Sequence, residues 1–154
     1  MEDLRIRRGT PNDLDLVMRH RIGMFRAMGY SELELAVVRE ASLPYFAKQL
    51  AQGAYHGWFF ENAEGRVVAG GGITMLDYQP HPRDPQPLRP YIVNVYTEPE
   101  YRRRGLARLL MDAMVEWCKA EGYYSVSLQA STEGRPLYEA MGFEPTNEMR
   151  LRFE

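Results

Sequence analysis

The sequence predicts an α+β fold in which helices pack on the faces of a mixed β-sheet. Stretches rich in β-branched and aromatic residues are interspersed with stretches whose apolar residues recur at helical spacing, in the order βααβββαβαβ. The 154 residues, 45% of them hydrophobic and 26% charged, have the composition of a soluble globular protein and enough length for an ordinary core. We therefore expect a single domain that spans residues 1–154.

The first half of the chain is expected to begin with a strand and a capped helix. Thr10 is a typical N-cap residue, Pro11 suits the first helical position, and Asp13 falls in the first turn, where acids are favoured. A second helix contains Pro44, which predicts a break or kink before that residue. In order, the expected elements are a strand at 4–7, helices at 11–29 and about 32–52, and strands at 57–61 and 66–76 joined by a hairpin turn at 62–65.

The second half opens with a proline-rich segment. Residues 78–90 contain five prolines, so they cannot pair as a central strand and are predicted to form a long, stiff loop. The run Gly70-Gly71-Gly72 in the preceding strand indicates a bulge or a close approach of substrate, or else tight packing of a helix over the strand. The remaining expected elements are a strand at 91–97, a helix at 106–121, a strand at 123–128, a helix at 133–141 and a last strand from Phe143 onward.

Charge and cysteine content narrow the function classes. A net charge of −2 does not attract the negatively charged surfaces of nucleic acids or anionic membranes, so neither is expected as a partner. The single cysteine, Cys118, cannot form an internal disulfide and is predicted to be a structural thiol. No apolar run approaches the roughly 20 residues of a membrane span, and the acidic start is unlike a cleavable signal, so a cytoplasmic location is expected. The histidines are scattered without metal-ligand spacing, and no metal is expected.

An unusual cluster of charge precedes the helix expected at 106–121. Three consecutive arginines, Arg102 to Arg104, and Gly105 stand at its first turn. A helix N-terminus carries about half a positive charge and four unpaired N–H groups, so cations there are unfavourable unless an anion joins them. Gly105 lets a ligand approach the backbone, and arginines add charge-assisted bonds to phosphate oxygens. The segment therefore predicts a phosphate site, while the Walker and dinucleotide-binding patterns are absent.

Two segments resemble the GCN5-related N-acetyltransferase (GNAT) superfamily. Residues 95–107 (Val-Tyr-Thr-Glu-Pro-Glu-Tyr-Arg-Arg-Arg-Gly-Leu-Ala) resemble its strand-to-pyrophosphate segment, with the pattern Gln/Arg-x-x-Gly-x-Gly/Ala. Residues 131–143 (Ser-Thr-Glu-Gly-Arg-Pro-Leu-Tyr-Glu-Ala-Met-Gly-Phe) resemble its C-terminal segment, which ends in Tyr-x-x-x-Gly-Phe. The resemblance implies the GNAT fold, a mixed and mostly antiparallel sheet of about six or seven strands flanked by about four helices.

The resemblance also implies the chemistry and its site. It implies transfer of an acetyl group from acetyl-CoA, without a metal, to a primary amine of a small molecule or antibiotic, by direct attack in a ternary complex. A homodimer is a further implication. The cofactor-binding residues implied are Val95, Tyr96, Thr97, Arg102, Arg103, Arg104, Gly105, Leu106, Ala107, Arg108, Ser131, Gly134, Arg135 and Tyr138.

Catalysis is expected to need an oxyanion donor, an acid and a base. The resemblance implies that a backbone N–H in the segment 95–97 is the oxyanion donor and that Tyr138 is the general acid. A phenol suits the acid role because it is protonated at neutral pH. The base stays open between Glu32 or Glu34, Asp77 and a water chain. The resemblance implies that the acceptor groove borders the end of the first helix, and the residues expected to contact the acceptor are Met24, Phe25, Met28, Tyr30, Asp77 and Asn94.

Two other functions stay open on the sequence alone. One is acetylation of a protein amine, either a lysine or an N-terminal amine. The other is a non-catalytic module that binds acyl-CoA as a sensor, which would have no need of an acid beside the sulfur.

Overall fold

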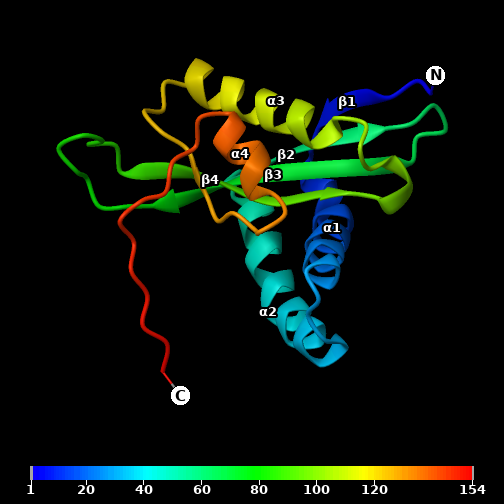
Figure 1. The fold of residues 1–154 in the computed structure, drawn as a ribbon, viewed down its shortest axis with the longest axis horizontal. Coiled ribbons are helices and arrows are strands. Elements are labelled where there is room, and N and C mark those ends of the chain that lie inside the picture. Colours follow the sequence, from blue (N-terminus) through cyan, green and yellow to red (C-terminus); the bar gives the residue numbers. More distant parts are fainter. Residues whose placement is uncertain (1, 154) are drawn as a thin grey trace.

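The computed structural model describes residues 2–153 and contains one five-stranded sheet in the order β1-β2-β3-β4-β5 (Figure 1). The first four strands pair antiparallel and β5 pairs parallel to β4, which makes the sheet mixed, as predicted. The elements are β1 (Arg5–Arg8), α1 (Leu14–Ala27), α2 (Glu32–Ala51), β2 (Tyr55–Glu61), β3 (Val67–Asp77), β4 (Leu88–Thr97), α3 (Leu106–Ala120), β5 (Ser127–Leu128) and α4 (Arg135–Ala140), with short 3₁₀ turns at Pro11–Asp13 and Pro99–Tyr101.

The sheet separates two hydrophobic cores. On one face, α3 contributes Leu110, Met111 and Met114, and side chains of α4 pack against the same cluster. On the other face, Val17 of α1 and Phe46 of α2 pack against the sheet. Figure 1 shows this layering, with α1 and α2 on one side of the strands and α3 and α4 on the other. The predicted α+β class is confirmed.

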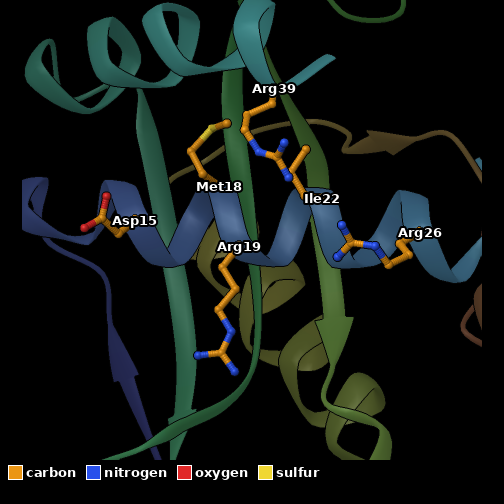
Figure 2. A pocket seen from close by; sticks show the side chains of 6 residues that line it. All are labelled: Asp15, Met18, Arg19, Ile22, Arg26 and Arg39. Carbon is orange, nitrogen blue, oxygen red and sulfur yellow. The ribbon is translucent and has the colours of Figure 1, made fainter. Parts of the chain in front are cut away.

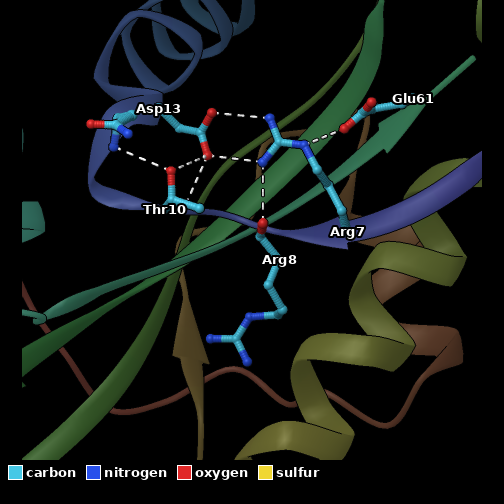
Figure 3. Close-up of polar contacts among 6 residues, drawn as sticks. Arg7, Arg8, Thr10, Asp13 and Glu61 are labelled. Carbon is cyan, nitrogen blue, oxygen red and sulfur yellow. Dashed lines mark hydrogen bonds and ion pairs between the residues drawn. The ribbon is translucent and has the colours of Figure 1, made fainter. Parts of the chain in front are cut away.

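The predicted cap at the start of the first helix is present and is tied to the sheet (Figure 3). The Thr10 hydroxyl accepts a hydrogen bond from the Asn12 N–H, and the Asp13 carboxylate accepts one from the Thr10 N–H. Arg7 of β1 donates twice to that carboxylate, at 2.9 and 3.0 Å, and also pairs with Glu61 of β2. The bonds from Arg7 are the main reason that the pKa of Asp13 is lowered. These contacts join the helix entry to β1 and β2, the first two strands of the sheet.

Of the break or kink expected before Pro44, the break is wrong, because α2 runs continuously from Glu32 to Ala51 with Pro44 inside it. A proline removes one N–H from the helix ladder and leaves the carbonyl four residues earlier, on Glu40, without its usual partner. Both Glu40 and Pro44 are exposed, so water can bond that carbonyl. The helix therefore accommodates the proline on its solvent side.

The three glycines of β3 make room for bulky side chains from both faces. A Cβ on Gly70 would stand 2.6 Å from Nδ1 of His20, and one on Gly72 would stand 2.0 Å from the Tyr55 hydroxyl. A Cβ on Gly71 would approach the flexible end of Met114 most closely, at 3.0 Å, and would make an ordinary contact with Val95 at 3.4 Å. Tight packing over the strand therefore explains these glycines, and a bulge lies on the neighbouring strand opposite them.

The proline-rich loop is shorter than predicted, because β4 begins at Leu88 and includes Pro90. Pro90 faces Met75 of β3, while pairing with β5 begins only at the following residue, Tyr91. A strand with one neighbour tolerates a missing N–H, as edge strands do. The loop itself is fastened to the segment before β5, since Gln86 bonds the backbone of Gly122 and Tyr124 at 3.0 Å each.

The C-terminal part of the sheet departs most from the prediction. The strand expected at 123–128 is reduced to Ser127–Leu128, and the strand expected from Phe143 onward is absent from the described residues 143–153. Among the described residues the sheet therefore has five strands rather than the six or seven that the resemblance implies.

Within residues 2–153, no helix combines the length and the apolar composition that crossing a membrane would require.

The packing at β3 leads to a stability prediction. Gly72→Ala should lower the free energy of unfolding by about 1–3 kcal/mol, because the new methyl group overlaps the buried Tyr55 ring. Urea denaturation followed by circular dichroism measures this. Gly71→Ala is the matched control and should cost clearly less, since the Met114 end can move. Equal midpoints for the two variants would contradict this explanation of the glycine run.

Candidate active site

A bulge in β4 sets the geometry of the candidate site. Gly72 faces Val93 and Gly70 faces Tyr96, so two steps along β3 correspond to three along β4. The extra residue lies around Asn94, whose φ of 61° is in the left-handed region that asparagine tolerates better than most residues. The bulge turns the second half of β4 away from the line of its first half.

The Asn94 side chain holds the bulge from inside the protein. It is only 2% exposed, its amide donates to the Tyr55 hydroxyl at 3.2 Å, and its carbonyl accepts from Arg21 at 3.0 Å. Arg21 also donates to Ser42 of α2 at 3.0 Å, so the network joins α1, α2, β2 and β4. Burial lowers the pKa of Arg21 and raises that of Tyr55 to about 12. Asn94, expected to touch the acceptor, is instead occupied by structural bonds.

Beyond the bulge, β4 and β5 separate. They pair only at Tyr91 with Ser127 and at Ile92 with Leu128. In the described part of the chain, the segment Val93–Thr97 therefore has a strand on its β3 side alone. This segment contains Val95, Tyr96 and Thr97, so the expected oxyanion-donor segment lies along an open strand edge. Such an edge offers backbone groups to an extended ligand.

The arginine turn has the backbone geometry of an anion cradle. Arg103 and Gly105 both adopt positive φ, at 62° and 78°, and Gly105 is the N-cap of α3 without a side-chain cap. The first turn of α3 contains no acidic residue, so the charge of its N-terminus is not offset from within the helix. Nothing lies within 4 Å of the point where a Cβ on Gly105 would stand. The space in front of the helix is open.

A hollow of about 270 Å³ lies over this turn. Its lining residues come from the end of β4, the turn, the start of α3 and the facing side of α4: Thr97, Tyr101, Arg102, Arg103, Gly105, Leu106, Ala107, Arg108 and Leu137. Most of the residues expected to hold the pyrophosphate are thus gathered around one cavity.

The arginines of the turn are held differently from one another. Arg102 donates to the Thr97 carbonyl at 2.9 Å and lies over the Tyr96 ring. Arg104 turns away from the hollow to the Glu100 carbonyl and to Glu2, so its side chain does not line the cavity. Arg103 has no hydrogen bond or ion pair to another residue within the described chain, which leaves its guanidinium available to an anion.

Helix α4 brings Tyr138 to the side of the sheet occupied by α3. Tyr138 packs against the core beneath α3 and meets Phe143 edge-on, with ring centroids 6.0 Å apart. Burial raises its pKa, so the phenol is protonated at neutral pH. The Ser131 hydroxyl accepts a bond from the Gly134 N–H, and a Cβ on Gly134 would stand 2.8 Å from the Tyr138 ring. Gly134 therefore serves the packing of Tyr138. Arg135 pairs with Glu139.

The acceptor residues expected around the end of α1 lie together, whereas Asp77 lies apart from them. Phe25 and Tyr30 stack edge-on at 5.5 Å near the end of α1, and Met28 and Tyr30 are about half exposed. Asp77 pairs with Leu88, about 20 Å along β4 from Asn94 at roughly 3.3 Å per residue. It is therefore remote from the bulge.

The two glutamates considered as bases are engaged elsewhere. Glu32 pairs with Arg26, and Glu34 accepts from the Ser31 N–H as part of the cap of α2. These bonds lower the pKa of both carboxylates. A carboxylate with a lowered pKa is a weaker proton acceptor.

A second hollow, of about 280 Å³, runs along the outer side of α1 (Figure 2). Its lining residues are Asp15, Met18, Arg19, Ile22, Arg26 and Arg39, none of them from the sheet, α3 or α4. Two of its three arginines are already paired, Arg19 with Glu98 and Arg26 with Glu32. It is separate from the gap between β4 and β5.

The sequence interpretation missed Arg21 and Tyr55, which secure the bulge. The available signal was that Arg21 lies on the same helical stripe as Val17, Ile22 and Phe25, where a cation is unusual. Across the described residues, no three His, Cys, Asp or Glu side chains come together as a possible metal site.

Comparisons with known proteins agree with this arrangement. A family model described as the acetyltransferase (GNAT) family matches residues 18–143. A crystal structure of a GCN5-related N-acetyltransferase from Ralstonia eutropha is 36% identical, with a TM-score of 0.92, covering 98% of this chain and 99% of that one. A predicted acetyltransferase from Clostridium acetobutylicum, solved with acetyl-CoA, is 26% identical, with a TM-score of 0.87 over 99% of this chain and 96% of that one.

A curated relative matches over a shorter range. A glucosamine 6-phosphate N-acetyltransferase from Trypanosoma brucei brucei is 30% identical over 96 residues, which are 62% of this chain and 63% of that protein. The match thus spans less than two thirds of the relative's length.

His20, beneath Tyr96, gives a pH prediction. It is 1% exposed, and burial, aided by the charge of Arg19, lowers its pKa to about 4. In the unfolded chain His20 takes up a proton near pH 6.5, whereas in the folded chain it stays neutral until the pH approaches 4. The free energy of unfolding therefore falls as the pH drops below about 6.5. From pH 7 to pH 5 the loss attributable to His20 should be about 2 kcal/mol.

Urea denaturation at several pH values measures this loss. His20→Leu should remove that part of the pH dependence and keep the part due to other groups. An unchanged pH slope in the variant would show that His20 does not titrate in this way.

Proposed function

Because the chain belongs to the acetyltransferase (GNAT) family, we propose that it transfers the acetyl group of acetyl-CoA to a primary amine of a small molecule or antibiotic in a ternary complex. The observation that carries this proposal is the positively charged turn at the start of α3, which opens onto a hollow beside an unpaired stretch of β4. The turn fits a diphosphate, and the strand edge fits an extended amide chain. Coenzyme A contains both.

The backbone around Gly105 is the part of the site that best suits the diphosphate of the cofactor. A side chain at this position would fill the space before the α3 N-terminus, where backbone N–H groups and the helix dipole favour a phosphate. Arg103 and Arg108 supply charge from the rim of the same hollow. Arg102 reaches the hollow from its bond to Thr97. These residues would hold the pyrophosphate.

The strand edge beyond the bulge would hold the pantetheine arm. Its backbone N–H and C=O groups between Val93 and Thr97 can pair with the amides of that arm, as a strand pairs with a strand. The cofactor supplies an activated acetyl thioester. A backbone N–H in the segment 95–97 would donate to the carbonyl oxygen as negative charge develops there, and loss of such a donor costs about 2.7–4 kcal/mol in comparable sites.

Tyr138 would donate a proton to the leaving sulfur. Its pKa is raised by burial, which keeps the proton on the phenol until the thiolate forms. Its neighbour in the helix, Leu137, lines the hollow over the turn, which supports a location of α4 beside the cofactor. Tyr138 is therefore the residue that distinguishes an enzyme from a module that only binds acyl-CoA.

Water is the base that this proposal favours. Glu32 and Glu34 are held in ion-pair and capping bonds that lower their pKa, and Asp77 is remote from the bulge. A water chain in the gap between β4 and β5 can carry the ammonium proton to bulk solvent.

A small-molecule acceptor is supported by the name of one relative. The curated relative is named as acting on glucosamine 6-phosphate, a small amine. On this chain, Phe25, Met28 and Tyr30 offer an apolar rim at the end of α1.

A cytoplasmic location belongs to the same proposal. The buried free thiol of Cys118, whose pKa burial raises to about 11, suits a reducing compartment.

Release of free thiol from acetyl-CoA, measured against a panel of amines, tests the activity. The panel contains amino sugars and their phosphates, aminoglycosides, polyamines, amino acids and peptides. Turnover with a small amine supports the proposal, while turnover with peptides alone would replace it by protein acetylation.

Tyr138→Phe tests the acid. The rate should fall by a factor of roughly 10²–10⁴, because the leaving thiolate loses its proton donor. Affinity for CoA, measured by calorimetry, should stay unchanged, because the ring remains in place. Unchanged turnover would remove Tyr138 from the mechanism.

Gly105→Val tests the phosphate turn. The variant should lose measurable CoA binding, because its side chain enters the cradle and its backbone must hold a φ of 78°, which a β-branched residue avoids. Circular dichroism checks that the fold persists. Arg103→Gln should weaken binding by roughly 10- to 100-fold. Arg104→Gln, in the same turn but facing Glu100, is the matched control and should bind nearly as wild type. Wild-type affinity in Gly105→Val would refute the assignment of the turn.

A further inference from the structure

The side chain of Arg21 is a partly buried cation that has no carboxylate partner within the described chain. Its Nε donates to the Ser42 hydroxyl and one terminal nitrogen, Nη1, donates to the Asn94 side-chain carbonyl, at 3.0 Å each. Both acceptors are neutral. The other terminal nitrogen, Nη2, donates to no residue within 2–153, and it is not one of the fully enclosed unpaired atoms of that range. Solvent or a ligand can therefore reach it.

Two other arginines on the same helix show that this lack of a counter-charge is unusual. Arg19 pairs with Glu98 and Arg26 pairs with Glu32, although about half of each arginine side chain is exposed. Arg21 is more enclosed than either, and burial lowers its pKa. A charge in a protein interior is unfavourable unless an opposite charge or strong hydrogen bonds compensate it. Helix α1 thus pairs its exposed arginines and leaves its enclosed one without an anion.

Aromatic rings provide part of the compensation for this charge. The guanidinium carbon of Arg21 lies 4.9 Å from the centroid of the Phe25 ring and 5.1 Å from that of the Phe46 ring. The groups that raise its pKa are the hydroxyls of Tyr55 and Tyr45, and phenols carry no charge at neutral pH. Ring faces and neutral oxygens stabilise a guanidinium less than a carboxylate or a phosphate does. An anion is therefore the group that these surroundings lack.

Arg21 lies on the side of the sheet that remains for an acceptor. Helices α3 and α4, and the hollow assigned to the cofactor, lie on the opposite side from α1 and α2 (Figure 1). Asn94, the partner of Arg21, is at the bulge, so the expected oxyanion-donor segment 95–97 lies about 3–10 Å further along the strand. Phe25, beside the guanidinium, belongs to the apolar rim expected for the acceptor. An amine bound there would have its other end within reach of Arg21.

We propose that Arg21 binds an anionic group of the acceptor, so that the acceptor is a small amine that also carries a carboxylate or a phosphate. This inference rests on the proposed acetyl transfer and narrows its acceptor. Nη2 would donate to the anion while Nε and Nη1 keep their bonds to Ser42 and Asn94, so binding leaves the bulge intact. A charge-assisted bond at this point would orient the amine toward the thioester. Acceptors with several positive charges would be repelled by the same cation.

Pairs of amines that differ only in the anionic group test the acceptor class. The pairs are glucosamine 6-phosphate with glucosamine, O-phosphoethanolamine with ethanolamine, and β-alanine with β-alaninamide, and release of free thiol from acetyl-CoA gives kcat/KM. In at least one pair the acidic member should be the better substrate by roughly 10- to 100-fold, because it gains a charge-assisted bond. The first two pairs report on phosphate and the third on carboxylate. Equal or higher kcat/KM for the neutral members, or for spermidine or an aminoglycoside, would overturn the proposal.

Variants of Arg21 test whether this residue is the source of the preference. Arg21→Gln should reduce the ratio of kcat/KM between acidic and neutral members to about one, and Arg21→Lys, which keeps the charge, should retain part of it. A purely structural role would lower both members alike and leave their ratio unchanged. Arg26→Gln, on the same helix, is the matched control and should keep the wild-type ratio. A preference that persists in Arg21→Gln would refute the role of Arg21.

Binding measurements separate a failure of this inference from a failure of the proposed activity. Calorimetry with the same pairs, in the presence and absence of CoA, should show tighter binding of an acidic member to the wild type and no such difference in Arg21→Gln. Acid-selective binding without any turnover would refute acetyl transfer alone. Turnover or binding without selectivity for the anion would refute this inference alone. The comparison within the wild-type protein does not depend on whether Arg21→Gln folds, which circular dichroism checks.

Discussion

The architecture of the site depends on one buried polar interaction, the bonding of Asn94 to Arg21 and Tyr55. A bulge interrupts the hydrogen-bond ladder of a sheet, so other interactions must stabilise it. Here the buried side-chain amide of Asn94 is hydrogen-bonded on one side to Arg21 and on the other to Tyr55. Removing any of the three side chains leaves a buried donor or acceptor unpaired, which costs more than the bond itself contributes. The bulge is thereby fixed, and with it the direction in which β4 leaves the sheet.

The consequences of the bulge extend along the chain to the arginine turn. The redirected strand carries Tyr96 onto α1, where Gly23 leaves room for its ring, and carries Thr97 to Arg102. The chain then enters α3 through two residues of positive φ. A helix start with cations and without an acid is unfavourable by itself. The local sequence thus sacrifices some stability at a position where an anionic ligand would restore it.

Features determined by neighbouring residues could be predicted from the sequence, and features determined by distant ones could not. The cap at Thr10 and the glycine at the start of α3 follow from local backbone chemistry, and both are found. The role of Arg21 could not be derived, because it depends on Asn94, which lies far along the chain. The effects of Pro44 and Pro90 were misjudged. The free-energy cost of the hydrogen bond that a proline cannot donate depends on whether that N–H position faces solvent or a neighbouring strand. The roles of Tyr138 and the turn in catalysis stay predictions, since they rest on ligand contacts.

The short contact between β4 and β5 also bears on motion and ligand-linked stability. Two paired residues hold this part of the sheet, so β5 can separate from β4 at a small fraction of the free energy of global unfolding. The gap proposed for the cofactor is therefore also a seam of weak strand pairing. A ligand that bonds β4 and packs against α4 would close this seam, and it would add a stabilisation that grows with the logarithm of its concentration above its dissociation constant. Amide protons along this seam would then report cofactor occupancy through their rate of exchange with solvent.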